Sequence, residues 1–306
     1  MVNNEKEKSF SNTRINWYPG HMAKTKKQII EDLKLIDVVV EILDARIPKS
    51  SQNPDLQEWT KNKKKIIVLN KSDLAEDNKS KQWIEYYKKQ GIPAVLTDSN
   101  SGKGINETIR EIEKIMQDDK KLQEQKGRIG KSIRVMIVGI PNVGKSSFIN
   151  RITKKSVATV GNKPGVTRQK QWVRLRENID LLDTPGILWP KLDQEETALN
   201  LAYTGTIKDD NIEKIEVAYF LLKYLLENKR QNLIQRYNLN EEEIEQILNN
   251  TENLENENIM QVLHMVGKKR GTIISGGRID EEKVSNLLIE EFRSGKLGKI
   301  TLEIPI

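Results

Sequence analysis

Short runs of apolar, mostly β-branched residues recur along the first two thirds of the chain, at residues 38–43, 66–69, 93–96, 135–138 and 179–182. Segments with helical spacing lie between them, at residues 79–89, 105–118 and 146–153. Apolar runs that alternate with helices are typical of buried parallel strands joined by right-handed crossovers. Residues 16–190 are therefore predicted to form a mostly parallel, doubly wound α/β domain.

The pattern changes after residue 190. Amphipathic segments follow one another near residues 195–203, 215–228, 241–249, 260–266 and 281–292, and strand-like runs nearly vanish. We expect an all-α C-terminal domain over residues 191–306. Residues 1–15 are polar and charged, and we expect a disordered tail there. A length of 306 residues suits two such domains.

The amino-acid composition excludes some kinds of chemistry but does not identify a function. The chain has no cysteine, which excludes disulfides, thiolate metal sites and cysteine nucleophiles. It also has no apolar stretch of the ~18 residues that a membrane span needs, and its first residues do not resemble a signal peptide. We expect a cytoplasmic protein, monomeric and without membrane contact.

Charge is distributed unevenly along the chain. Lys and Arg number 51 against 44 Asp and Glu, with eight basic and no acidic residues over 151–176, and seven Glu and no base over 238–258. A one-sided positive surface favours a polyanion such as nucleic acid, whereas the alternative is an ordinary solvated face. Because Asn, Lys and Ile are all abundant, as in AT-rich genomes, the net charge of +7 decides little.

Residues 139–146 read Gly-Ile-Pro-Asn-Val-Gly-Lys-Ser, which fits the phosphate-binding loop G-x4-G-K-[ST], and they lie between a predicted strand and a predicted helix. In such a loop, backbone N–H groups surround the β-phosphate, Lys145 reaches the β- and γ-phosphate oxygens, and the Ser146 hydroxyl ligates Mg²⁺. The residues expected to bind the nucleotide here are Asn142, Val143, Gly144, Lys145, Ser146 and Ser147.

A second motif, Asp183-Thr-Pro-Gly186, follows the run at 179–182. Asp183 is expected to hold Mg²⁺, and the N–H of Gly186 is expected to contact the γ-phosphate and register its loss. A threonine that ligates Mg²⁺ must come between the two motifs. Thr167 is preferred to Thr159, because the Pro and Gly around it suit a mobile loop.

Asn70-Lys-Ser-Asp73 directly follows the run at 66–69. An Asp73 carboxylate accepts from both N1–H and the exocyclic amine of guanine, Asn70 can meet N7, and the stem of Lys71 can cover the ring. Adenine lacks that donor pair, so the motif predicts specificity for GTP and GDP. Asp98 and Ser99, after the next strand, are expected to supply a backbone contact to the guanine oxygen.

The order of these motifs is circularly permuted. Conventional small GTPases carry the phosphate loop first and the guanine motifs last, whereas here the guanine motifs at 70 and 97 precede 139, 167 and 183. The sheet can close in the same way if residues 127–131 join the former ends.

The new break lies next to Gly186, where the helical domain begins. We hypothesise that GTP sets the orientation of that domain. Small-angle scattering should then give different shapes with GDP and with a non-hydrolysable GTP analogue, and identical curves would rule the coupling out.

The chain resembles the circularly permuted bacterial GTPases that act in assembly of the 50S ribosomal subunit. The strings that carry the resemblance are Trp-Tyr-Pro-Gly-His-Met at 17–22, Asp-Ala-Arg-Ile-Pro at 44–48, the permuted motifs, residues 183–191, and Glu-Phe-Arg-Ser-Gly-Lys-Leu-Gly at 291–298. The resemblance implies a factor that binds late 50S precursors through ribosomal RNA and ribosomal proteins. It also implies weak intrinsic GTPase activity, stimulation by the particle, and RNA contact through the helical domain.

Catalysis needs a group that orients the attacking water. Many GTPases place a Gln after D-x-x-G, but here that position is Ile187, which predicts slow intrinsic hydrolysis. The resemblance points to His21, carried on a mobile N-terminal loop, and the alternative is a loop histidine that contacts RNA or nothing. Asn142 resembles the phosphate-loop asparagine of potassium-stimulated GTPases, which implies that it helps to hold K⁺ near the β- and γ-phosphates; the alternative is loop hydrogen bonding.

Two other functions stay open at this stage. One is a nucleotide-gated RNA-binding module in which hydrolysis is incidental. The other is a GTPase of tRNA modification or signalling, for which the permuted order and helical tail are unexpected.

Overall fold

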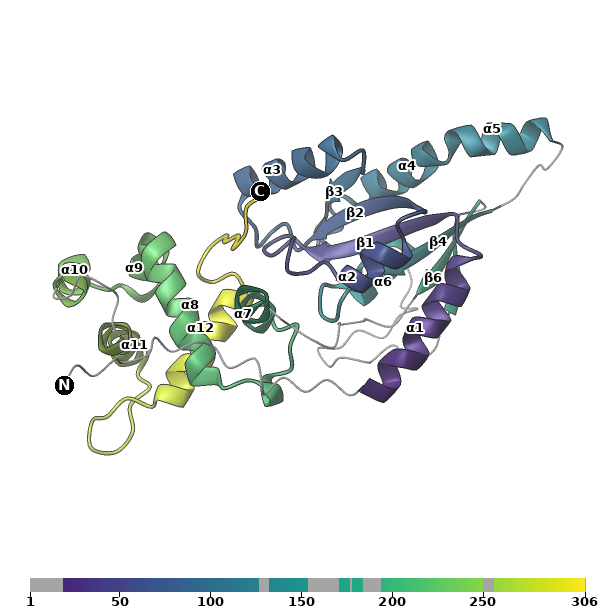
Figure 1. The fold of residues 1–306 in the computed structure, drawn as a ribbon. Helices are drawn as coiled ribbons and strands as arrows, with labels where there is room; N and C mark the ends of the chain where they lie inside the picture. Colours follow the sequence, from purple (N-terminus) through teal and green to yellow (C-terminus); the bar gives the residue numbers. More distant parts are fainter. Residues whose placement is uncertain are drawn as a thin grey trace, which may run out of the picture. The chain divides into compact units, whose positions relative to one another are not determined.

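The computed structural model describes residues 19–126, 132–153, 171–176, 178–183, 194–249 and 256–305 (Figure 1). The described residues divide into two compact units. The sheet unit contains residues 19–183 and 299–305, and the helical unit contains residues 194–298. The expected tail at 1–15, the connection at 127–131, Thr167 and Gly186 lie outside the described residues.

A six-stranded sheet forms the centre of the sheet unit, in the order β3-β2-β1-β4-β6-β5. The strands are β1 (Val38–Asp44), β2 (Lys64–Asn70), β3 (Ala94–Leu96), β4 (Ile133–Val138), β5 (Gln171–Arg176) and β6 (Ile179–Asp183). All neighbouring pairs are parallel except β5 with β6. The mostly parallel α/β fold expected from the apolar runs is therefore confirmed.

Helices cover both faces of this sheet. On one face, α1 (Pro19–Leu33), α2 (Pro54–Trp59) and α3 (Asp77–Lys89) bury apolar side chains against β1, β2 and β4. The helices α4 (Ile105–Ile115) and α6 (Lys145–Thr153) pack on each other, and α5 (Gln117–Gln125) continues beyond α4 (Figure 1). The parallel strands β1, β2, β3, β4 and β6 all end at the same sheet edge, where the loops carry the predicted motifs.

The sequence pattern missed strand β5. This strand lies at the edge of the sheet and has only half-buried apolar side chains, at Val173 and Leu175, while Trp172 is 44% exposed. An edge strand that is solvated on one side does not need a continuous apolar run. Helices α1, α2 and α5 were missed as well.

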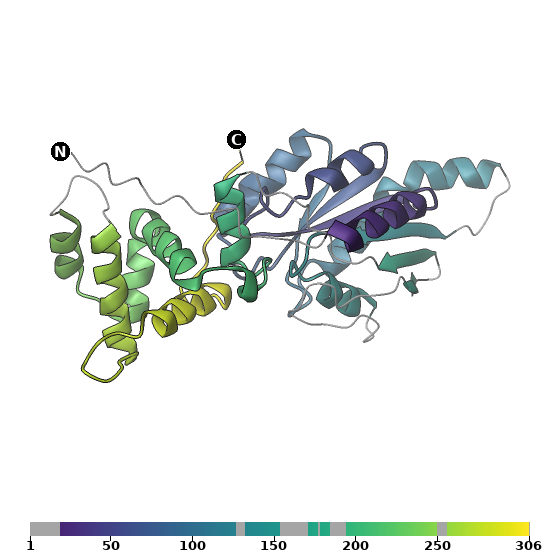
Figure 2. The ribbon, with the colours of Figure 1, turned by 60° about the horizontal axis from the view of Figure 1, so that its bottom comes forward.

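The helical unit is built from six α-helices within the described residues (Figure 2). They are α7 (Glu195–Tyr203), α8 (Lys214–Asn228), α9 (Arg230–Tyr237), α10 (Glu241–Asn249), α11 (Asn256–Arg270) and α12 (Glu281–Arg293), with one 3-10 turn, η2 (Asp209–Asn211). The expected helical character is confirmed. Only α9 and the short turn had no counterpart in the predicted segments. None of the described helices has both the length and the apolar character of a membrane span.

Two charged side chains of α12 contact neighbouring helices of the helical unit. Glu291 accepts from Arg236 of α9 at 2.8 and 2.6 Å, and Arg270 of α11 lies 3.5 Å away. Although burial opposes ionisation of Glu291, the hydrogen bond from Arg236 and the charges of both arginines lower its pKa. Arg293 donates to the carbonyls of Tyr203 and Ala202 at the end of α7. Glu291 and Arg293, both in the segment 291–298 that carries the family resemblance, therefore have structural roles within this unit.

The last residues of the chain return to the sheet unit. Ile300 N–H donates to the Leu74 carbonyl at 3.0 Å, and Leu302 N–H donates to the Arg46 carbonyl at 2.8 Å. The Glu303 carboxylate accepts from the N–H groups of Lys49 and Ser50. The segment at 299–305 therefore lies with the sheet unit, although the sequence pattern had placed all of 191–306 in the helical domain.

Candidate nucleotide site

The predicted phosphate loop connects β4 to α6, as the motif requires. Gly139 has φ 151°, and a Cβ there would lie 2.5 Å from the Ile42 carbonyl oxygen. Gly144 has φ 94°, and its Cβ would lie 2.3 Å from the side-chain nitrogen of Asn70. Glycine is needed at both positions because strand β1 and the Asn70 amide approach the loop closely.

Lys145 and Ser146 begin α6 at the end of this loop. The Lys145 side chain is buried, and its Nζ donates to the Ile140 carbonyl at 3.1 Å. The first turn of a helix presents unpaired N–H groups and a partial positive charge, which together favour an anion. The loop therefore brings an ammonium and a helix start to one place, an arrangement suited to a phosphate group.

Asn70 joins three loops of the site. Its side-chain N–H donates to the Val143 carbonyl of the phosphate loop at 2.8 Å. Its side-chain oxygen accepts from the hydroxyl of Thr97 at 3.1 Å and from the hydroxyl and backbone N–H of Ser99 at 2.8 and 3.2 Å. The guanine motif at 70–73, the loop after β3 and the phosphate loop are thus held together by one buried amide.

The other guanine-motif residues lie beside it. Asp73 has an exposed side chain, and Leu74 N–H donates to the Lys71 carbonyl, which closes a turn around it. The Asp98 carboxylate accepts from Asn100 N–H at 2.8 Å. Burial of Asp98 opposes its ionisation, but hydrogen bonds from neighbouring residues outweigh that effect, so its pKa is lowered.

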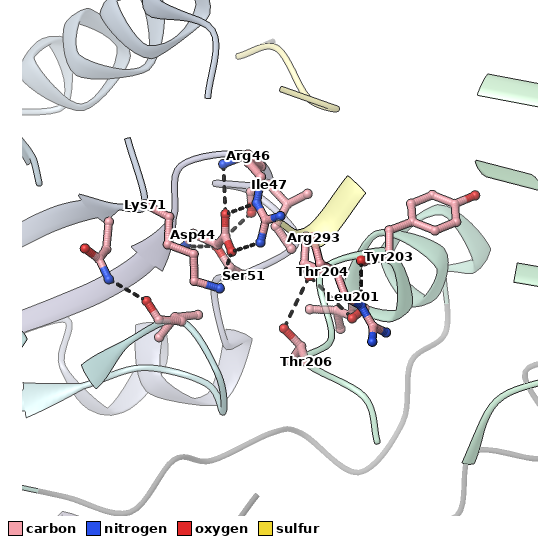
Figure 3. Close-up of polar contacts among 12 residues, drawn as sticks. Asp44, Arg46, Ile47, Ser51, Lys71, Leu201, Tyr203, Thr204, Thr206 and Arg293 are labelled. Carbon is pink, nitrogen blue, oxygen red and sulfur yellow. Dashed lines mark hydrogen bonds and ion pairs between the residues drawn. The ribbon is translucent and has the colours of Figure 1, made fainter. Parts of the chain in front are cut away.

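Lys71 leaves β2 with φ 59°, and its Nζ lies 3.0 Å from Oδ2 of Asp44 at the end of β1 (Figure 3). Asp44 also accepts from Arg46, from Nε at 2.9 Å and from Nη2 at 2.7 Å. This network is the part of the site that reasoning from chemistry missed. The sequence Asp-Ala-Arg-Ile-Pro at 44–48 could have indicated it, since this segment follows a buried strand at the sheet edge where the other motifs lie.

Two of the predicted magnesium ligands, Ser146 and Asp183, lie within the described residues. Ser146 has a half-buried side chain at the start of α6. Asp183 is the last residue of β6 and pairs with Ile137, one position before the end of β4, the strand that leads into the phosphate loop. Among the described residues no cluster of three or more His, Asp or Glu could hold a metal. A hydroxyl at a helix start and a carboxylate at a strand end suit Mg²⁺, which commonly takes few protein ligands and binds largely through phosphates and water.

His21 lies in the first turn of α1, so the expected mobile loop at this position is corrected to a helix. The helix is followed by β1 and packs on the same sheet through Ile29 and Leu33. With 15 residues it extends about 22 Å, close to the length of the strand beside it. Its start therefore lies toward the edge where β1 ends, which is also the edge of the motif loops.

The parallel sheet, the strand–loop–helix phosphate site and the guanine motif define a P-loop GTPase whose motifs run in circularly permuted order. The family model described as "50S ribosome-binding GTPase" matches residues 134–265, and the model described as "RsgA GTPase" matches residues 56–193.

Relatives match along nearly the whole chain. Ribosome biogenesis GTPase A of Bacillus cereus is 43% identical over 291 residues, covering 95% of this chain and 94% of the relative. The protein of the same name from Thermotoga maritima is 31% identical, covering 95% of each chain. Mitochondrial ribosome-associated GTPase 1 of Bos taurus is 32% identical, covering 94% of this chain and 88% of the relative.

Solved structures agree with this assignment. YlqF from T. maritima bound to GNP has a TM-score of 0.61 at 26% identity, with 92% of this chain and 98% of that chain covered. The chain belongs to the ribosome biogenesis GTPase A family, and it is an enzyme that hydrolyses GTP.

Proposed function

We propose that this GTPase acts in the cytoplasm, as a monomer, in a late step of 50S ribosomal subunit assembly. Relatives named for ribosome biogenesis and the 50S ribosome-binding family model support this role. The structural observation that supports GTP binding, on which this role depends, is the Asn70 amide, which joins the phosphate loop and both guanine loops into one site. GTP occupancy would set the orientation of the helical unit, which would contact ribosomal RNA and proteins.

The family uses Mg²⁺, and the proposed ligands in this chain are Ser146, Thr167 and Asp183. When bound, the ion neutralises charge on the β- and γ-phosphate oxygens. Lys145 adds a fixed positive charge at the same phosphates, and Gly186 would donate its N–H to the γ-phosphate. Asn70, Lys71, Asp73, Asp98 and Ser99 would hold the guanine.

His21 is proposed to orient the attacking water, and Asn142 is proposed to hold K⁺. The position of His21 at the start of α1, toward the motif edge of the sheet, supports the first proposal. Asn142 has a half-buried side chain inside the phosphate loop, whose amide oxygen is a suitable ligand for a cation, and this supports the second.

One experiment tests these proposals: GTP turnover with 50S subunits, 30S subunits or neither, in K⁺ and in Na⁺. We expect 50S subunits alone to accelerate turnover, and Na⁺ to slow it. His21→Ala should lower the stimulated rate by about 10²-fold or more, the usual size of a lost acid–base or water-orienting group.

His264→Ala is the matched control, because His264 contacts Glu281 within the helical unit at 2.7 Å. It should leave stimulated turnover near the unmodified rate. Turnover indifferent to 50S subunits would instead favour a nucleotide-gated RNA-binding module. A rate equal in K⁺ and Na⁺ would remove the potassium role of Asn142, and full stimulation of His21→Ala would remove the role of His21.

A further inference from the structure

Two buried carboxylates on strand β1 have different surroundings. Glu41 lies 3.5 Å from Lys65 and accepts from Gln57, and burial raises its pKa despite these partners. Asp44 is 1% exposed, yet its pKa is well below the ordinary value, because Arg46 and Lys71 outweigh the cost of burial. Asp44 therefore carries a permanent negative charge at the end of the strand.

This charge is held in one orientation. Arg46 binds both carboxylate oxygens of Asp44 with its guanidinium and adds a backbone N–H to Oδ1 at 3.1 Å. The Asp44 N–H donates to the hydroxyl of Ser51, which in turn donates to the Ile47 carbonyl (Figure 3). A bidentate guanidinium fixes direction as well as distance. Neither oxygen can turn away from its partner without breaking a buried hydrogen bond.

Lys71 is the exposed end of the network. Its side chain is 24% exposed, while those of Asp44 and Arg46 are 1% and 2% exposed. A lysine side chain at the surface normally samples many rotamers, and ordering it costs free energy when a ligand binds. The contact of its Nζ with Asp44 fixes the far end of the stem, and the left-handed backbone of Lys71 fixes the near end.

We propose that Asp44, held by Arg46, is a positioning residue that keeps the stem of Lys71 in place to cover the guanine ring. This inference rests on the proposed function of Lys71 as a guanine contact. Asp44 itself does not contact the nucleotide. It acts by removing the ordering cost of Lys71 before GTP or GDP arrives.

The test measures GDP affinity, and KM and kcat for GTP, in the full chain. Asp44→Asn keeps the shape of the side chain but removes the charge opposite Lys71. We expect GDP affinity to fall about three- to tenfold, the range for ordering one long side chain. KM for GTP should rise by the same factor with kcat unchanged, because the guanine lies away from the reacting phosphate.

A double-mutant cycle with Lys71→Met separates positioning from a general effect on the loop. Asp44→Asn should cost nothing further when Lys71 is already methionine. Equal losses in both backgrounds, or no loss in either, would overturn the proposal. If Lys71→Met binds GDP normally, Lys71 does not contact the guanine, and the positioning role of Asp44 is overturned as well. That result would leave the assignment of the chain as an enzyme that hydrolyses GTP unchanged.

Two further variants guard against simple loss of folding. Glu41→Gln removes another buried carboxylate from the same strand and should leave GDP affinity unchanged. Asp44→Glu keeps a charge for Arg46 but displaces the carboxylate by one methylene. It should raise KM for GTP in protein that circular dichroism shows to be folded, and an unchanged KM would count against positioning.

Discussion

Replacing Asp73 by asparagine is expected to lower GTP affinity by about 10⁴-fold, the discrimination typical of a site built on hydrogen bonds. The carboxylate is proposed to accept from two guanine donors, and an asparagine amide would direct its own N–H groups at one of them. Xanthine carries a carbonyl in place of the exocyclic amine, so the variant should bind xanthosine triphosphate better than GTP. Calorimetry or competition against a fluorescent nucleotide measures both affinities.

Asp118→Asn provides the control for that substitution. Asp118 lies in the first turn of α5, in the sheet unit but outside the motif loops. It should leave both affinities unchanged. Tight GTP binding by Asp73→Asn, without any gain for the xanthine nucleotide, would show that Asp73 does not contact the base.

Replacing Lys145 by alanine is expected to lower GTP turnover by about 10²- to 10³-fold, the usual effect of deleting one donor to transition-state charge. The Lys145 ammonium already donates to the Ile140 carbonyl, so the loop holds it in place before the nucleotide binds. Because negative charge grows on the β–γ bridging oxygen, which leaves with GDP, the loss should be larger in kcat than in GDP affinity. Single-turnover kinetics separates the two quantities.

Lys114→Ala is a matched control on α4, where the lysine side chain is 73% exposed. It should hydrolyse GTP at the unmodified rate. Thermal unfolding should also be compared, because Lys145 is buried. A Lys145→Ala protein that is folded and fully active would exclude the lysine from the phosphate site.

Much of the site could be predicted because it depends on local sequence. The loop at 139–146 and the motif at 70–73 each follow a short apolar strand, and parallel strands end at one sheet edge. Their meeting in space therefore follows from the fold class. The Asn70 contact with the Val143 carbonyl could not be predicted in detail, because it links residues 73 apart in sequence.

What was missed depends on long-range or edge contacts. Strand β5 has one solvated side, which removes the continuous apolar run that marks its neighbours. The ion pairs of Asp44 with Arg46 and Lys71 look like ordinary surface charges until burial is known. Glu303 accepts from the Ser50 N–H across 253 residues, a pairing that no periodicity can indicate. Thr167 and Gly186 stay predictions.

The return of residues 299–305 to the sheet unit makes the helical unit an insertion within the GTPase domain. A fragment that ends at residue 190 would lack the Glu303 carboxylate that accepts from Lys49 and Ser50, and the backbone N–H that meets the Arg46 carbonyl. After a single protease cut between residues 183 and 194, the helical unit would still be attached to the sheet unit, because residues 299–305 remain bound there by noncovalent contacts. Isolating the GTPase domain therefore calls for reconnecting residues 299–305 through a linker, not for a C-terminal truncation.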